Sequence, residues 1–327
     1  MRAVVLREHG APDVLRVEDV PDPVPGPEEV VVGVIATAVN RADLLQRMGL
    51  YPPPVAMPVE IPGLELAGRV LRCGSRVTLW QPGDAVMGIV AGGGYAEEAA
   101  VHERQLLAVP SAVLLEDAAA IPEVFITAWD ALVVQGGLTS GRWALVHAGA
   151  SGVGTAAIQI ARAIGARVAV TCSATKIDAC AVLGADAVFE RSPHDWPADA
   201  AAAVPGGFDV ILDVVGGEEL GRNVGAVARQ GRIVQVGTMG GGAAQINLGA
   251  LMGKRASLHG TVLRARPLEE KIAVTRRFAA EVLPLFDRGM LHPVIDSRFP
   301  LDASEDAHRR MEANANVGKI LLDVSAA

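Results

Sequence analysis

A glycine-rich break between two apolar runs limits the fold of this chain more than any other feature. Residues Leu145–Lys176 read LVHAGASGVGTAAIQIARAIGARVAVTCSATK. The pattern predicts a buried strand, a short loop, a helix from about Thr155 and a second strand. That order is the context of the dinucleotide-binding fingerprint G-x-G-x-x-G. Gly149 and Gly154 match its outer glycines, and Ser151 replaces the middle one.

The loop predicts a binding site for a pyrophosphate. A small residue at position 151 still lets the backbone approach the anion, and the helix that follows directs its first N–H groups and positive dipole end toward it. The alternative is an ordinary tight turn. Because strand, loop, helix and second strand follow in the required order, we interpret the loop as a dinucleotide site.

The second strand is followed by no acidic residue. An NAD site usually has Asp or Glu about 20 residues after the loop, where the carboxylate accepts a hydrogen bond from the ribose 2′-hydroxyl. Here the strand leads into TCSATK. Ser173, Lys176 and Arg191 suit the 2′-phosphate of NADPH, which a carboxylate would repel. The alternative is that Lys176 and Arg191 are solvated surface residues.

The middle third of the chain predicts a parallel, doubly wound α/β sheet. Helical stretches separate most of six candidates for buried strands, which is typical of such a sheet. The candidates are Trp143–His147, Arg167–Thr171, Asp186–Phe189, Phe208–Asp213, Arg232–Val236 and Ser257–Thr261.

The two ends of the chain resemble each other and differ from the middle. Short β-rich runs such as RAVVL, LRVEDV and EVVVGVIATAV alternate with Gly- and Pro-rich turns, which indicates a small barrel or sandwich. The tail has a helical pattern over Leu268–Asp287, the β-like run VIDSRFP and a closing strand GKILLDV. We therefore predict a discontinuous domain, residues 1–122 and 263–327, with the nucleotide domain, residues 123–262, inserted into it.

Composition argues against several classes of protein. The net charge of −8 without a basic block disfavours nucleic-acid binding. Apolar stretches such as Val30–Val39 are about half as long as a membrane span, and the N-terminus lacks a signal-peptide pattern. We expect a soluble, cytoplasmic protein without a membrane partner. Cys73, Cys172 and Cys180 form no C-x-x-C pattern, and the seven histidines have no ligand spacing, so we expect no metal.

Motifs that carry a family resemblance cover nearly the whole chain. They include NRADLLQRMGLYPPP, IPGLELAG, AAAIPEVFITAWDAL, HAGASGVGTAAIQIARAIGA, ILDVVGG and MEANANVGKILL. With these motifs the chain resembles the medium-chain dehydrogenases/reductases. It is most similar to the zinc-free quinone oxidoreductases, and within them to the branch of the tumour-suppressor-induced quinone oxidoreductase. The resemblance implies a split catalytic domain like the GroES barrel, a Rossmann domain within it, and a homodimer joined along the edge strand near Ser257–Thr261.

The resemblance also implies that the chain lacks the catalytic zinc of its relatives. Zinc-dependent members of the superfamily have cysteine, histidine and cysteine where this chain has Asn40, Leu64 and Glu123. Glu65 matches an acid of the family, but one carboxylate does not hold zinc. The four-cysteine lobe of those relatives is absent as well.

Most residues expected at the cofactor follow from the same resemblance, and Arg191 is added because it lies just past the third strand. Thr127 resembles the threonine near the nicotinamide, and the chain departs from the family at Arg191, where a tyrosine is usual, and by a deletion of one residue nearby. The residues expected to contact NADPH are Thr127, Ser151, Gly152, Val153, Gly154, Ser173, Lys176, Arg191, Gly216, Gly237, Val262, Leu263 and Asn316.

The expected chemistry is hydride transfer from NADPH to a quinone or a similar electron-poor acceptor, without flavin. Without zinc, Asn40 and Tyr51 are the candidates for the groups that stabilise the oxyanion formed. Tyr51 either donates its phenolic hydrogen or only packs, and Asn40 orients a ligand or a loop. Two alternatives remain: reduction of the C=C bond of an enone or enoyl thioester, and a non-catalytic protein that senses NADPH.

Overall fold

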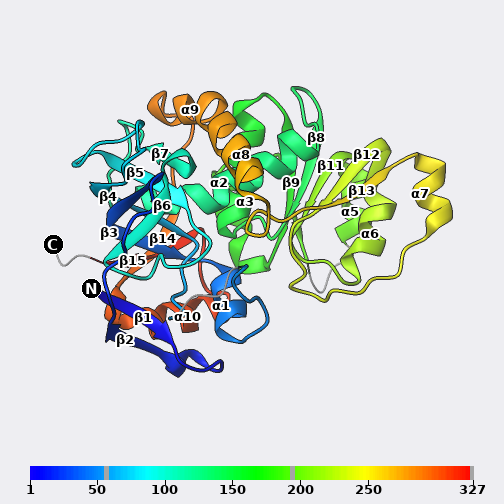
Figure 1. The fold of residues 1–327 in the computed structure, drawn as a ribbon. Helices are drawn as coiled ribbons and strands as arrows, with labels where there is room; N and C mark the ends of the chain where they lie inside the picture. The colour runs from blue at the N-terminus through cyan, green and yellow to red at the C-terminus, as the bar shows by residue number, and fades with distance from the viewer. Residues whose placement is uncertain (55–58, 192–195, 325–327) are drawn as a thin grey trace. The chain divides into compact units, whose positions relative to one another are not determined.

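The computed structural model describes residues 1–54, 59–191 and 196–324, and the chain divides into two compact units. The first unit comprises residues 1–126 and 264–327, and the second comprises residues 127–263. The tail therefore returns to the unit that the N-terminal part begins (Figure 1). The two boundaries lie four residues and one residue later than predicted. The first boundary falls inside helix α2, Pro122–Trp129, which begins in the first unit and ends in the second.

The second unit is built on a six-stranded sheet in the order β10-β9-β8-β11-β12-β13, with every neighbouring pair parallel. This is the strand order of a doubly wound nucleotide-binding fold. Its strands are β8 Trp143–His147, β9 Arg167–Cys172, β10 Ala187–Glu190, β11 Phe208–Asp213, β12 Val227–Gln235 and β13 Ser257–Gly260. Five strands lie within one residue of the predicted bounds, and β12 begins five residues earlier than expected.

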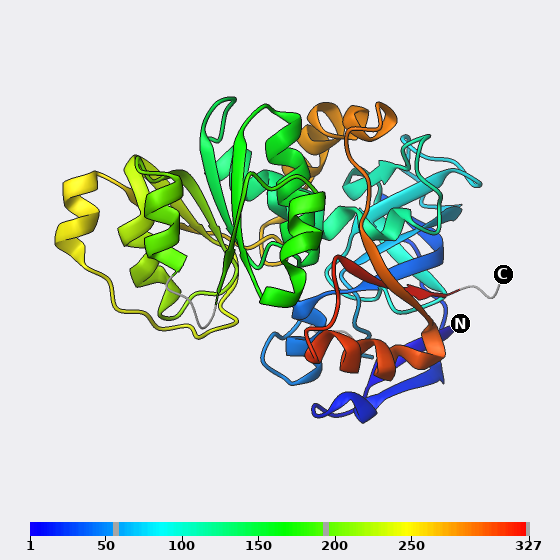
Figure 2. The ribbon, with the colours of Figure 1, turned by 180° about the vertical axis from the view of Figure 1, so that it is seen from behind.

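Helices connect the strands of the second unit (Figures 1 and 2). Inward-facing residues such as Leu145, Ile211 and Ile233 are fully buried, as expected for parallel strands covered on both faces. The helices are α3 Gly152–Ala163, α4 Ile177–Val182, α5 Trp196–Ala203, α6 Glu219–Ala226 and α7 Leu248–Lys254, and a π-helical stretch, Asp130–Gln135, extends α2.

Helix α3 begins earlier than the sequence suggested. We expected it from about Thr155, but its first residue is Gly152. The reason is the side chain of Ser151, which accepts a hydrogen bond from the N–H of Gly154 at 3.0 Å. Serine is a preferred residue at this capping position because its oxygen satisfies an N–H group that the helix leaves without an acceptor.

The first unit contains a seven-stranded sheet and a separate hairpin. The sheet follows the order β14-β15-β3-β4-β5-β7, with β6 also paired to β3, and β1 pairs with β2 in the hairpin. The pairs are antiparallel apart from β14 and β15. The strands are β1 Arg2–Leu6, β2 Leu15–Asp19, β3 Glu29–Val39, β4 Glu65–Cys73, β5 Ala85–Ile89, β6 Glu98–His102, β7 Leu106–Ala108, β14 Ile295–Pro300 and β15 Lys319–Asp323.

One helical prediction in the first unit was wrong in detail. The pattern over Leu268–Asp287 forms two helices, α8 Leu268–Glu281 and α9 Leu283–Asp287. Pro284 has no N–H to continue the hydrogen-bond ladder, so the chain breaks before it. Helices α1 Arg41–Arg47 and α10 Ser304–Glu312 also belong to this unit, and α2 begins in it.

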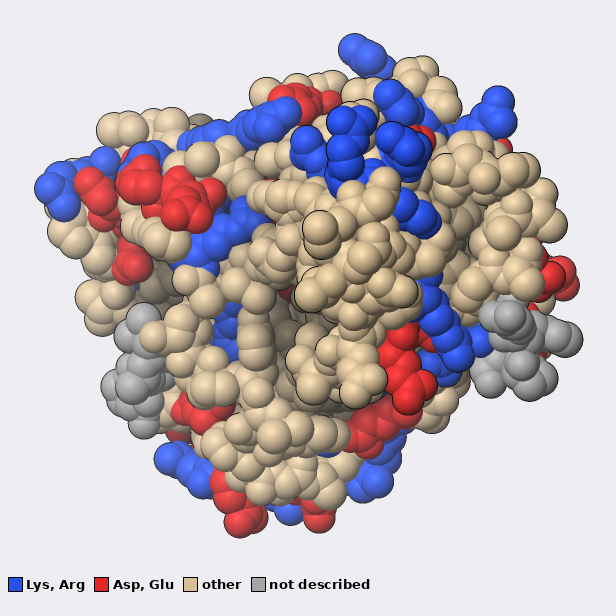
Figure 3. Space-filling view, turned by 90° about the vertical axis from the view of Figure 1, so that its right-hand side faces the viewer, with Lys and Arg blue, Asp and Glu red and all other residues tan. Residues whose placement is uncertain are grey.

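Charged side chains and one long apolar helical stretch can be located on the folded chain. Basic and acidic side chains are interspersed on the face shown in Figure 3, with basic ones gathered in its upper part. One helical stretch, Ala118–Gln135, is long and apolar enough to cross a membrane, and 72% of it is buried inside the fold.

Candidate active site

The glycine-rich loop after β8 needs glycine at both of its outer positions. A Cβ atom at Gly149 would lie 2.5 Å from the Cβ of Val170 on β9. A Cβ atom at Gly154 would lie 2.4 Å from the carbonyl oxygen of Ala148. No side chain fits at such distances, so these glycines allow α3 to pack closely against the ends of the strands. This is the role that glycine has in the dinucleotide fingerprint.

The start of α3 offers donors to an anion. Gly152 and Val153 are the first residues of the helix, whose first N–H groups have no acceptor within the helix. The positive end of the helix dipole lies at the same place. Small residues and unused N–H groups fit a pyrophosphate, so the loop can hold a dinucleotide through the residues that the sequence indicated.

The cations expected at the 2′-phosphate lie beside the carboxyl ends of β9 and β10. The N–H of Arg191 donates to the carbonyl of Cys172 at 2.8 Å, which fixes Arg191 next to the end of β9. Lys176 ends a short 3₁₀ turn after the same strand. A hydrogen bond with Cys180 and the charge of Lys176 lower the pKa of the Cys172 thiol, which places Lys176 close to that strand end.

A carboxylate that the sequence reading overlooked lies at the same edge. Glu190 is opposite Cys172 in the register of β10 and β9. Its presence reduces the positive charge that Lys176 and Arg191 supply. The side chains of Ser173 and Arg191 are exposed and that of Lys176 is half-buried. Lys176, Arg191 and Glu190 therefore lie near the ends of β9 and β10, and Asp178 follows in the first turn of α4.

The remaining predicted cofactor residues divide between the two units. Gly216 and Gly237 follow β11 and β12, and Val262 and Leu263 follow β13, all at carboxyl ends of the parallel strands where such folds bind ligands. Thr127 lies in α2. Asn316 belongs to the first unit, where its amide donates to the carbonyl of Gly318 at 2.8 Å. Their contacts with a cofactor stay predictions.

The sequence did not predict a buried polar network that lies at the strand ends next to the nucleotide loop. His147 at the end of β8 lies 2.9 Å from the hydroxyl of Thr171 and 2.7 Å from the Asn223 Oδ1. Asn223 donates to Asp213 at 2.8 Å, and the other oxygen of Asp213 accepts the N–H of Gly216 at 2.9 Å. The network ties the ends of β8, β9 and β11 together, so it holds the strand ends that carry the loop.

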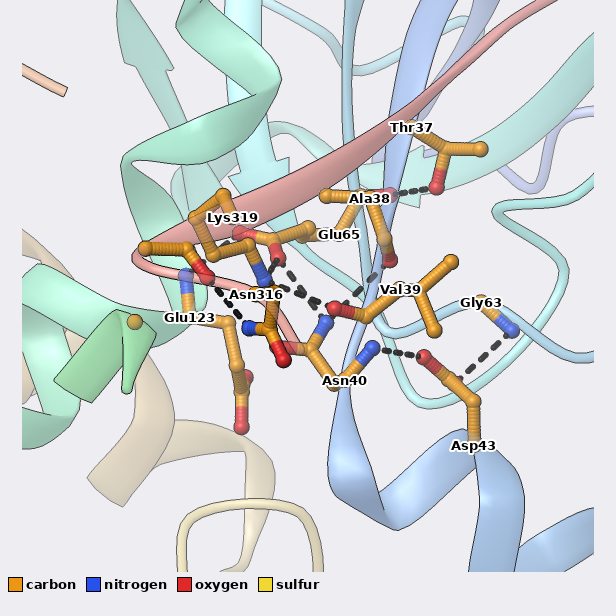
Figure 4. A network of polar contacts seen from close by, with 12 residues as sticks. Thr37, Ala38, Val39, Asn40, Asp43, Gly63, Glu65, Glu123, Asn316 and Lys319 are labelled. Atoms are coloured by element: carbon orange, nitrogen blue, oxygen red, sulfur yellow. Dashed lines mark hydrogen bonds and ion pairs between the residues drawn. The ribbon is translucent and has the colours of Figure 1, made fainter. Parts of the chain in front are cut away.

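The first unit contains a second buried network around Asn40, at the junction of β3 and α1 (Figure 4). The Nζ of Lys319 donates to the Oε1 of Glu65 at 2.7 Å, to the Oδ1 of Asn40 at 2.6 Å and to the carbonyl of Val39 at 3.2 Å. Asn40 in turn donates to Glu65 at 2.8 Å. All three ammonium protons are used, which is the condition for keeping a buried ion pair stable.

Asp43 fixes the backbone of Asn40 from the other side. Its carboxylate accepts the N–H of Asn40 at 2.7 Å and that of Gly63 at 3.2 Å. Burial raises the pKa of Asp43 to about 6. The amide of Asn40 also donates to the carbonyl of Ala38 at 3.3 Å, so both of its N–H groups are engaged inside the protein. This arrangement favours the role of Asn40 in orienting a loop.

Arg264 holds the loop that carries Tyr51, a contact that sequence reasoning missed. Its guanidinium donates to the carbonyl of Tyr51 at 3.1 Å, to the carbonyl of Ala91 at 2.9 Å and to Gln46 at 2.7 Å. The guanidinium carbon also lies 5.0 Å from the centre of the Tyr51 ring. Burial, followed by the charge of Glu123, raises the pKa of Tyr51. The phenol therefore stays protonated and able to donate a hydrogen bond.

The positions of the zinc ligands in related dehydrogenases do not fit a metal in this chain. Asn40 and Glu123 lie in the network around Glu65, whose second oxygen accepts the N–H of Glu123 at 2.8 Å. Leu64 precedes Glu65 and is buried. An amide, an alkyl group and one carboxylate do not make a zinc site. Among the residues that the structure describes, no group of three His, Cys, Asp or Glu side chains could hold a metal.

Comparisons with known proteins show the family to which the chain belongs. Residues 26–111 match the alcohol dehydrogenase GroES-like domain, and residues 152–280 match a family described as zinc-binding dehydrogenase. A quinone oxidoreductase from Lama guanicoe is 33% identical over 329 residues, 98% of this chain and 97% of the relative. The chain belongs to the quinone oxidoreductase family of medium-chain dehydrogenases/reductases. The predicted fold class, a GroES-like domain with a doubly wound Rossmann domain, is confirmed.

Other members of this superfamily differ in what their names state. The synaptic vesicle membrane protein VAT-1 homolog of Rattus norvegicus is 31% identical over 339 residues, 98% of this chain and 84% of the relative. The structure of mycobacterial Rv1454c with NADPH has a TM-score of 0.90 and 28% identity, covering 99% and 100% of the two chains. An NAD-dependent alcohol dehydrogenase has a TM-score of 0.88 and 31% identity over 99% and 100%. Both nicotinamide cofactors thus occur among similar structures.

Proposed function

We propose that this oxidoreductase transfers hydride from NADPH to quinones or related electron-poor carbonyl compounds and needs no zinc. The relatives named quinone oxidoreductase support the acceptor class. One observation carries the choice of cofactor: Lys176 and Arg191 gather at the ends of β9 and β10, where an NAD site has its acid. The residues at the family's zinc positions support the absence of the metal.

The residues of this chain divide the task between binding and charge stabilisation. NADPH, when bound, supplies the hydride. The N–H groups at the start of α3 hold its pyrophosphate, and Lys176 and Arg191 hold its 2′-phosphate. The hydroxyl of Tyr51, kept protonated by its buried surroundings, donates to the oxygen that becomes negative on the acceptor. Asn40, held by Lys319 and Glu65, fixes the start of α1.

The choice of cofactor is tested by titrating NADPH and NADH into wild type, Lys176→Ala and Arg229→Ala. Arg229 is exposed near the amino end of β12, away from the carboxyl ends of the strands where the cofactor is expected. Its replacement therefore controls for the loss of one positive charge. A lost charge-assisted contact costs about 1.5–3 kcal/mol, or tenfold and more in affinity. We expect Lys176→Ala to lose this much affinity for NADPH, and Arg229→Ala to keep the affinity of wild type. Equal affinity of wild type for the two cofactors would contradict the proposal.

The acceptor class needs a separate measurement. Oxidation of NADPH at 340 nm is followed with ortho- and para-quinones, an enone and an enoyl thioester. We expect the quinones to react with the highest kcat/KM. A clear preference for the enoyl thioester would assign the chain to C=C reduction. No oxidation with any acceptor, together with tight binding of NADPH, would favour a non-catalytic protein that senses the cofactor.

A further inference from the structure

Glu123 is a carboxyl group in the first unit that the proposed function does not yet use. Its backbone N–H is fixed by Glu65 at 2.8 Å, which sets the start of α2. Its side chain points away from Lys319 and Glu65 (Figure 4), and its oxygens have no hydrogen-bond partner within the described part of the chain. The side chain is half-buried, and its oxygens are not among the fully buried polar atoms that lack a partner in the described part of the chain, so the carboxyl group is reached by solvent.

The groups around Glu123 favour its neutral form. Burial comes first and the negative charge of Glu65 second, and together they raise the pKa of Glu123 to about 8. Asp43 on α1 acts in the same direction, whereas the cations Lys319 and Arg264 oppose it. Lys319 has no free proton to donate to Glu123, since Glu65, Asn40 and Val39 accept all three. Near neutral pH Glu123 is therefore a carboxylic acid with a hydrogen to donate.

The position of Glu123 relates it to the chemistry. The charge of Glu123 contributes to the raised pKa of Tyr51, so the two side chains are close enough to interact electrostatically. Thr127, predicted to contact the nicotinamide, follows four residues later in α2, and residues four apart share one face of a helix. A side chain held at its backbone and free at its carboxyl is suited to proton transfer.

We propose that Glu123 is a catalytic residue that gives the acceptor the proton completing its reduction; the inference rests on the proposed function. The hydride brings two electrons and one hydrogen to the acceptor and leaves a negative charge on an acceptor oxygen. The O–H bond of Glu123 breaks, a new O–H bond forms on that oxygen, and Glu123 becomes a carboxylate. Solvent returns the proton to Glu123 before the next turnover. Tyr51 then has the role of stabilising the anion by a hydrogen bond.

The test compares wild type, Glu123→Gln, Glu123→Asp and Glu116→Gln by single-turnover oxidation of NADPH with a para-quinone between pH 6 and pH 10. Glu116 is exposed and lies in the loop before α2, so its replacement repeats the chemical change outside the site. Infrared difference spectra record the carboxyl C=O band over the same pH range in the absence of cofactor. Circular dichroism verifies that each variant is folded.

The expected result has three parts. In wild type the rate falls as the pH rises through about 8, because the acid is lost. Glu123→Gln is slower by about 100-fold, within the usual range for a general acid, and has no fall at that pH. Glu123→Asp keeps an acid and recovers part of the rate, while Glu116→Gln behaves like wild type. A carboxyl band that titrates near pH 8 is present in wild type and absent in Glu123→Gln.

Other outcomes separate the two proposals. If Glu123→Gln keeps the wild-type rate and the same alkaline fall, Glu123 is not the proton donor although the quinone reductase stands. If no carboxyl band titrates above pH 7, the inference is overturned as well. If wild type does not oxidise NADPH with any quinone that is offered, the proposed function itself fails. If Glu123→Gln does not fold, the pH profile and infrared titration of wild type and Glu123→Asp decide.

Discussion

At the scale of single residues, Lys319 holds together the buried network around Asn40 and Glu65. The buried carboxylate of Glu65 needs a positive partner, and the ammonium group of Lys319 provides it at 2.7 Å. The same ammonium orients Asn40 at the start of α1. Removal of one member of such a pair leaves an uncompensated charge inside the protein. The chain thus has an internal cation between Asn40 and Glu65.

Tyr51 is the residue whose chemical role can be separated from its packing. Tyr51→Phe keeps the ring under Arg264 and removes only the hydroxyl. If the hydroxyl stabilises the forming oxyanion, kcat should fall by about tenfold or more with little change in the affinity for NADPH. Tyr51→Ala should lower kcat and raise KM, because it also removes the ring.

The two Tyr51 variants are measured by steady-state reduction of a para-quinone, with NADPH affinity measured separately by fluorescence titration. A Tyr51→Phe variant that behaves like wild type, beside a Tyr51→Ala variant with a raised KM, would show that Tyr51 only packs. The outcome decides between the two roles that the sequence left open.

At the scale of elements, the strand–loop–helix unit β8–α3 determines whether the second unit can bind a dinucleotide. The loop has no room for a side chain at Gly154, since a Cβ there would lie 2.4 Å from a backbone oxygen. Gly154→Ala should therefore displace the loop, destabilise the fold by about 1–3 kcal/mol and weaken NADPH binding. Thermal melting and cofactor titration measure the two effects.

The control for Gly154→Ala is Gly206→Ala, because a Cβ atom at Gly206 would meet nothing within 4 Å. This substitution should leave stability and cofactor affinity close to those of wild type. Wild-type affinity for NADPH in Gly154→Ala would mean that the close approach of α3 to β8 has no part in binding.

Elements with a strong local pattern could be predicted from the sequence. The bounds predicted for β8 and β11 from apolar runs between turn residues match the observed ones, because parallel strands are buried on both faces. Helix ends were less predictable. The cap at Ser151 and the break before Pro284 depend on individual hydrogen bonds rather than on hydrophobic period.

Residues that meet only through folding could not be predicted. Lys319 lies 254 positions from Glu65 in the sequence, and Arg264 lies 213 positions from Tyr51, yet both pairs are in contact. Ser173, Lys176 and Arg191 were predicted together because they follow adjacent strands of one sheet. The family resemblance made Asn40 and Tyr51 candidates, but it did not reveal which groups hold them.

At the scale of the whole molecule, β13 is an edge strand: among the described residues no strand pairs with its outer side. Leu258 on this strand is 40% exposed, and an unpaired strand edge is a template for pairing with another chain. We propose that two copies of the chain pair along this edge. Light scattering after gel filtration should then give about twice the 33.9 kDa of one chain.

A charged substitution on β13 tests this dimer. Leu258→Lys should shift the mass toward that of one chain, because it places an ammonium group in the proposed contact. Val182→Lys is the control, since Val182 is 87% exposed on α4 and lies away from β13. A dimer that survives Leu258→Lys, or a monomeric wild type, would refute pairing along this edge.

The measurement that tests the central claim most directly is a single turnover of metal-free protein. The protein is treated with a chelator, its zinc content is determined, and oxidation of NADPH by a para-quinone is followed at 340 nm under anaerobic conditions. We predict less than one zinc in ten chains, about one NADPH oxidised per active site, and a rate equal to that of untreated protein. No oxidation by the metal-free protein, with activity restored by added zinc, would contradict the account.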